Sequence, residues 1–173
     1  VYTYFTTLYT QPMFSNIASS EQTHMDSVKA LLDRYDLAAP VADTAGVFNN
    51  ADLKQLYTDL IKSGSQSLAD ALLAGAAIEE IDILDLKERL AQVDQADIRQ
   101  VYESLLYGSY NHLNAFSSIY ASQTGAAYTP QFMNDAEWTE FQNYLTENGL
   151  FSGSGGRGRR NGGGSGTGGG GKR

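Results

Sequence analysis

Apolar residues recur at intervals of three and four along most of the chain, the pattern typical of amphipathic α-helices. Alternation of the strand type is nearly absent, and glycines and prolines divide the sequence into helical segments. The predicted segments are a short stub over 1–9 and helices over 14–35, 51–62, 65–90 (beginning at Ser65 or Ser67), 94–122 and 135–148. The lengths of the three longest suit a helical bundle, so we predict an all-α fold.

The three longest segments share an unusual distribution of polar residues. Each has a stripe that is apolar at both ends and polar at two central positions three residues apart. Because residues three apart lie on one side of a helix, these pairs can meet in one buried layer. The pairs are Glu21 with His24, Glu79 with Asp82, and Ser109 with His112. Glu80 is an alternative to Glu79, since a modest rotation of its helix would turn it inward.

Burying these carboxylates and imidazoles in an apolar core costs free energy unless something compensates. A divalent metal does so, and carboxylate oxygen with neutral imidazole nitrogen suits iron, manganese or zinc. Taken singly, a Glu-x-x-His pair more often belongs to a polar surface or core. Three pairs in register favour a metal site, similar in kind to the carboxylate-bridged di-metal bundles.

Composition excludes several classes of protein. The chain has no Cys, which rules out disulfides, thiolate zinc sites and iron–sulfur clusters. Its longest apolar run is too short for a membrane span. It opens at Val1 without an initiator Met or a basic leader, so we expect a processed protein or a fragment. Any signal peptide would lie outside this sequence, and the sequence does not indicate the cellular compartment.

Charge divides the chain into two parts. Residues 1–152 hold all 20 acidic residues and seven of the 12 basic ones, a net charge of −13. Residues 153–173 hold five basic residues and 12 of the 18 glycines. We predict one domain over 1–152 and a disordered Gly/Arg-rich tail over 153–173, since the tail has too few apolar groups to offset its ordering entropy. The acidic body makes nucleic acid an unsuitable specific partner.

Three separate stretches carry a resemblance to a known family: FSNIASSEQTHMDSVKALLDRYDL, DALLAGAAIEEIDILDL and VYESLLYGSYNHLNAF, with the connector FNNADLKQLYTDLIKSGSQSL between the first two. Over residues 1 to about 130 the chain resembles the ferritin-like family labelled domain of unknown function 2202. The resemblance implies a four-helix bundle, in many members with a di-iron or related site. The positions it implies as ligands are Glu21, His24, Glu79 or Glu80 with Asp82, and His112.

Two departures from that pattern matter. The resemblance implies an acidic helix upstream of Val1, so the first helix of this bundle is truncated and one wall is open. We therefore expect a homo-oligomer or another chain that supplies the missing helix. The last helix offers Ser109 where a di-iron site has Glu, and serine at best hydrogen-bonds a ligand or a water.

The leading hypothesis is a metal-binding ferritin-like domain, with a di-metal site and an oxidase, peroxidase or metal-handling role. Tyr102 or Tyr110 would then be candidates for a redox relay beside the metal. The alternative is a metal-free structural or interaction module whose bundle another chain completes. A third hypothesis is a secreted acidic protein tethered by its tail. Ser109 and His112 share a helix face without a strained turn, which argues against a serine hydrolase.

Overall fold

The computed structural model describes residues 1–40, 44 and 46–150, and this part of the chain forms six α-helices and no strand. The helices are α1 (Tyr2–Leu8), α2 (Pro12–Arg34), α3 (Ala51–Gly64), α4 (Leu68–Leu90), α5 (Ala96–Thr124) and α6 (Asp135–Glu147). The predicted all-α class is thus confirmed. None of these helices combines the length and the apolar character that crossing a membrane requires. The tail predicted over 153–173 lies outside the described residues.

Short polar signals set where the helices begin. The side chains of Asn50 and Ser67 accept backbone N–H groups in the first turns of α3 and α4. Asn134 and Glu137 form a capping box at the start of α6. Helix α2 begins at Pro12, two residues earlier than predicted, because proline fits the first turn, where its missing N–H is not needed.

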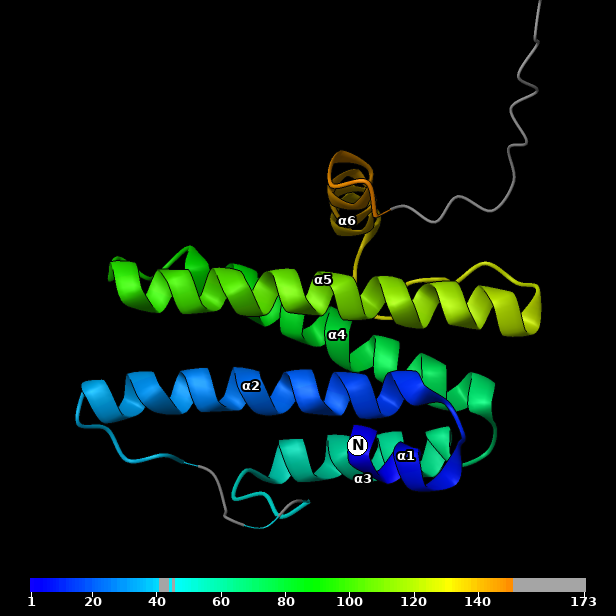
Figure 1. Ribbon diagram of the computed structural model, residues 1–173, viewed down its shortest axis with the longest axis horizontal. Coiled ribbons are helices and arrows are strands. Elements are labelled where there is room, and N and C mark those ends of the chain that lie inside the picture. Colours follow the sequence, from blue (N-terminus) through cyan, green and yellow to red (C-terminus); the bar gives the residue numbers. More distant parts are fainter. Residues whose placement is uncertain (41–43, 45, 151–173) are drawn as a thin grey trace, which may run out of the picture.

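Three long helices form the body of the molecule: α2 and α5 run alongside each other, and α4 crosses them obliquely (Figure 1). Helices α4 and α5 make the most extensive pair, α3 packs on α4, and α1 packs on α2. Helix α6 lies on the far side of α5 from α2 and is seen nearly end-on (Figure 1). Its Phe141 and Leu145 are buried, and Trp138 packs beside them.

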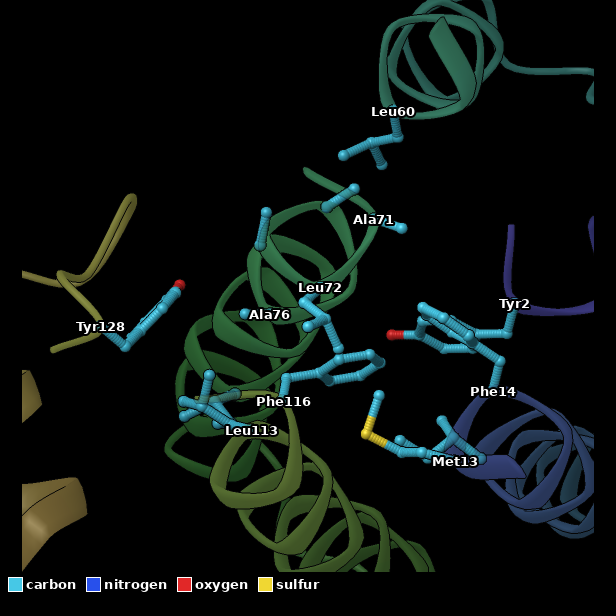
Figure 2. Packing of buried hydrophobic residues seen from close by; sticks show 14 of the residues in the cluster. Tyr2, Met13, Phe14, Leu60, Ala71, Leu72, Ala76, Leu113, Phe116 and Tyr128 are labelled. Atoms are coloured by element: carbon cyan, nitrogen blue, oxygen red, sulfur yellow. The ribbon is translucent and has the colours of Figure 1, made fainter. Parts of the chain in front are cut away.

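Aromatic side chains fill the core where α1, α2, α4 and α5 meet (Figure 2). Phe116 of α5 stacks on Tyr2 of α1, with ring centroids 5.5 Å apart, and contacts Phe14 of α2. A Cβ at position 75 of α4 would lie 2.2 Å from the Phe116 ring, so Gly75 permits this close approach. The short helix α1 is therefore anchored in the core through Tyr2 and Phe5, both buried.

Candidate metal centre

Three of the predicted ligand residues converge at mid-length of the long helices. Glu21 of α2, Glu79 of α4 and His112 of α5 each place one ligand atom so that all three atoms lie within 4.8 Å of one another. His112 Nδ1 lies 2.9 Å from Glu21 Oε1 and 3.5 Å from Glu79 Oε2. Glu79 is fully buried, His112 is buried, and Glu21 is partly exposed.

Apart from their ion-pair contacts with one another, the same three atoms are buried without a hydrogen-bond partner among the described residues: Glu21 Oε1, Glu79 Oε2 and His112 Nδ1. A buried polar atom left without a partner costs about 1–3 kcal/mol, and more when it is charged. Two carboxylate oxygens and one imidazole nitrogen are ligands that first-row divalent cations accept. A cation bound between them would satisfy all three atoms at once, so the donor set fits a metal.

Each of the three residues also has its second heteroatom engaged by a neighbouring side chain. These contacts join His24 Nδ1 to Glu21 Oε2 (3.2 Å), the Tyr2 hydroxyl to Glu79 Oε1 (2.5 Å), and Ser20 Oγ to His112 Nε2 (3.1 Å). Such outer contacts orient the side chains of a metal site and fix the tautomer of a ligand histidine. The group is therefore held in place from outside by three further side chains.

In the ion-free group, the positive imidazole substitutes for a cation. Burial opposes ionisation of Glu21, but the imidazoles of His112 and His24 more than offset it, and the pKa of Glu21 falls to about 2. Burial likewise opposes protonation of His112, but Glu21 and Glu79 raise its pKa to about 9. Burial raises the pKa of Glu79, although His112 acts in the opposite direction. A cation must displace the His112 proton in order to bind.

A groove of about 520 Å³ lies beside the group, between α2, α4 and α5. Its lining includes Glu21, His24, Asp82 and Ser109, together with apolar side chains of the three helices. Burial and the charges of Glu79 and Glu21 raise the pKa of Asp82 to about 8. Asp82, His24 and Ser109 thus border the group from the groove and are not among its three convergent residues.

Glu80, the predicted alternative to Glu79, faces another part of the molecule. Its buried carboxylate accepts hydrogen bonds from the Tyr128 hydroxyl and from the backbone N–H groups of Gln131, Phe132 and Met133. The reason is helix geometry, because consecutive residues point about 100° apart. With Glu79 directed at His112, Glu80 is turned toward the segment that connects α5 to α6.

The predicted relay tyrosines also lie elsewhere. Tyr110 packs against Phe141 and Tyr144 of α6, with its ring 4.4 Å from that of Tyr144, and burial raises its pKa to about 12. Tyr102 precedes His112 by ten residues, which is about 15 Å along α5. The tyrosine that contacts a residue of the group is Tyr2.

Sequence reasoning missed two residues that touch the group, Tyr2 and Ser20. Ser20 directly precedes Glu21 and lies four residues before His24, a spacing that could have placed it on the same face of α2. For Tyr2 the sequence held no such signal, since α1 spans seven residues and lies more than 70 positions from Glu79.

Comparison with known proteins identifies the family to which the chain belongs. Residues 1–143 match the model of the uncharacterized protein domain DUF2202. The chain belongs to the DUF2202 family. The uncharacterized protein MJ0754 of Methanocaldococcus jannaschii is 45% identical to this DUF2202 chain over 139 residues, which cover 80% of the chain and 75% of that protein.

The fold of this DUF2202 chain is also similar to a solved structure. The crystal structure of the hypothetical protein MJ0754 from Methanococcus jannaschii matches it with a TM-score of 0.77 and 42% sequence identity. The match covers 82% of this chain and 81% of that one. The arrangement of the helices in this chain therefore resembles that of a solved structure.

Proposed function

We propose that this chain is a metal-binding domain of the ferritin-like type, in which Glu21, Glu79 and His112 hold a divalent cation. The observation that carries the proposal is the convergence of three buried ligand atoms, from three helices, whose contacts among the described residues are only with one another. Oxygen and imidazole donors favour iron or manganese, with zinc as the redox-inactive alternative.

The role we propose for such a site is metal handling or an oxidase or peroxidase reaction. A bound iron or manganese would supply the electron-transfer chemistry that no side chain of the group provides. The chain's own residues would bind the cation, exclude water on the side of Phe116, and leave the groove beside His24 and Asp82 as the route of access. The three long helices with a polar layer at mid-length support the ferritin-like bundle.

Metal binding can be tested directly on the purified chain. We expect ion-free protein equilibrated with Fe²⁺, Mn²⁺ or Zn²⁺ to retain metal after gel filtration, as measured by elemental analysis. His112→Ala and Glu79→Gln should abolish retention, whereas Ser109→Ala should keep most of it. Glu88→Gln, on the exposed surface of α4, is the matched carboxylate control. Equal retention by all four variants would refute the assignment of these ligands.

A second candidate function is an interaction module whose bundle is completed by a helix from another polypeptide. The observation that favours it is the groove between α2, α4 and α5, which is lined by apolar side chains such as Met25, Leu32 and Leu86. Met25 is 56% exposed in the isolated chain. An amphipathic helix from a second copy or from another chain would cover these side chains and close the group from outside.

Two measurements separate the candidates. A metal-binding domain loses thermal stability when a chelator removes its ion, since a ligand that binds only the folded state stabilises it. An interaction module shows no change on chelation but elutes as an oligomer, and Met25→Glu, which places a charge in the groove, returns it to a monomer. A monomer that is stable without metal and insensitive to chelation would contradict the metal proposal.

A further inference from the structure

Each carboxylate in the group presents a single free oxygen. Glu79 directs Oε2 at His112, while its Oε1 accepts the hydrogen bond of the Tyr2 hydroxyl. Glu21 directs Oε1 at His112, while its Oε2 accepts from His24 Nδ1. A carboxylate that bridges two metal ions in the bidentate mode uses both oxygens, and in Glu79 and Glu21 one of the two already accepts a hydrogen bond.

The number of donors points the same way. Di-metal helical bundles draw on six ligand residues, four of them carboxylates. The group described here has three residues, two of them carboxylates. Its third member, His112, contributes Nδ1 alone, because Nε2 contacts Ser20 Oγ and carries the proton when Nδ1 is free to bind a cation.

The hydrogen bond that orients Glu79 is donated by Tyr2, whose side chain is buried in the core. Tyr2 is 7% exposed, and its ring stacks on Phe116 with the hydroxyl directed toward α4 (Figure 2). The hydroxyl also approaches the carbonyl oxygen of Gly75, at 3.3 Å, which leaves it a narrow range of positions. Tyr2 therefore restrains Glu79 Oε1 to one place and leaves Oε2 as the oxygen directed at His112.

We propose that the group binds one divalent cation per chain, and that Tyr2 is the positioning residue that makes Glu79 a ligand through Oε2 alone. This inference rests on the proposed metal-binding function and specifies its stoichiometry. It differs from the di-metal site predicted from the sequence, because the outer contacts occupy the oxygens that a second ion would need.

The test uses Co²⁺ as the probe, since its visible absorption reports the number and kind of ligands. Co²⁺ is titrated into ion-free protein and bound ions are counted by native mass spectrometry for the wild type, Tyr2→Phe and Tyr4→Phe. Tyr4 is 37% exposed on the same helix and serves as the matched control. Tyr2→Phe keeps the ring that stacks on Phe116 and removes only the hydroxyl.

We expect one Co²⁺ per chain in the wild type and in Tyr4→Phe, with the same spectrum. Tyr2→Phe should weaken binding by about 10–100-fold and change the Co²⁺ spectrum, as Glu79 gains a second free oxygen. Ser20→Ala, which leaves the core packing intact, should weaken binding in the same range through His112 and serves if Tyr2→Phe does not fold.

Two results would overturn the inference while leaving metal binding in place: two Co²⁺ ions per wild-type chain, or wild-type affinity and spectrum in Tyr2→Phe. A wild-type chain that binds no Co²⁺, Fe²⁺ or Mn²⁺ at all would instead refute the proposed function itself.

Discussion

Replacing Glu80 with glutamine tests how strongly the connection between α5 and α6 is tied to α4. The Glu80 carboxylate is fully buried, and Oε2 accepts from the backbone N–H groups of Gln131 (3.0 Å), Phe132 (2.6 Å) and Met133 (2.8 Å). Glutamine retains the shape and one oxygen but no negative charge, so all three bonds change from charge-assisted to neutral.

The expected cost follows from that count. A hydrogen bond to a charged group contributes about 1.5–3 kcal/mol and a neutral one about 0.5–1.5 kcal/mol, so each bond loses roughly 1 kcal/mol. The Tyr128 hydroxyl, which donates to Oε1, can rotate to accept from the new amide and adds little. We therefore expect Glu80→Gln to lower the free energy of unfolding by about 3 kcal/mol.

The assay is urea unfolding of ion-free protein, followed by circular dichroism, with Glu88→Gln as the exposed control on the same helix. Hydrogen exchange of the amides of residues 131–133 supplies a local measurement, since these amides lose protection when the carboxylate weakens. A loss below 1 kcal/mol with unchanged exchange at 131–133 would refute the reasoning, because it would show that the buried charge is not what holds this segment.

Three further outcomes follow from the geometry of the group and the core. The pKa of His112 is about 9 in the folded state against an ordinary value of 6.5, so protonated His112 stabilises the fold fully below pH 6.5 and loses this effect as pH rises through 9. Urea titrations of ion-free protein should show the free energy of unfolding decline over this range. His112→Gln should remove the decline. A Cβ at position 108 would lie 2.5 Å from the His24 ring, so Gly108→Ala should weaken Co²⁺ binding about 10–100-fold, which calorimetric titration would measure. Gly75→Ala drives a Cβ to 2.2 Å from Phe116 and should cost about 1–3 kcal/mol in thermal unfolding; an unchanged melting temperature would show that the ring moves aside freely.

The sequence predicted the helices well because each carries its own signals. Asn50 caps the helix predicted from residue 51, and Ser67, one of the two predicted starts, caps α4. The convergence of Glu21, Glu79 and His112 was also predictable, since apolar stripes on three long helices fix which faces turn inward. Local periodicity is sufficient to align such residues, even when they lie far apart in the chain.

The rest depended on tertiary contacts that no local pattern encodes. The pattern could not choose between Glu79 and Glu80, because the two differ by a rotation that only the partners of α4 decide. The contact of Tyr2 with Glu79 arises from the way α1 turns back onto α2, across more than 70 residues. The backbone N–H groups of Gln131, Phe132 and Met133, which bind Glu80, have no signature in the sequence.

Neighbouring buried carboxylates on α4 have a mechanical consequence. Small residues at Ala74, Ala76 and Ala77 precede them on α4, and small side chains form low ridges that resist turning about the helix axis less than large ones do. Glu79 and Glu80 supply that resistance from two directions, one held by Tyr2 and the other by the backbone of residues 131–133. These contacts therefore fix the rotation of α4 about its axis, and under the proposed function a cation would meet a ligand that is already aimed. A change in the segment after α5 would misdirect Glu79 without touching the proposed metal site, so the metal affinity of that site would depend on residues that lie outside it.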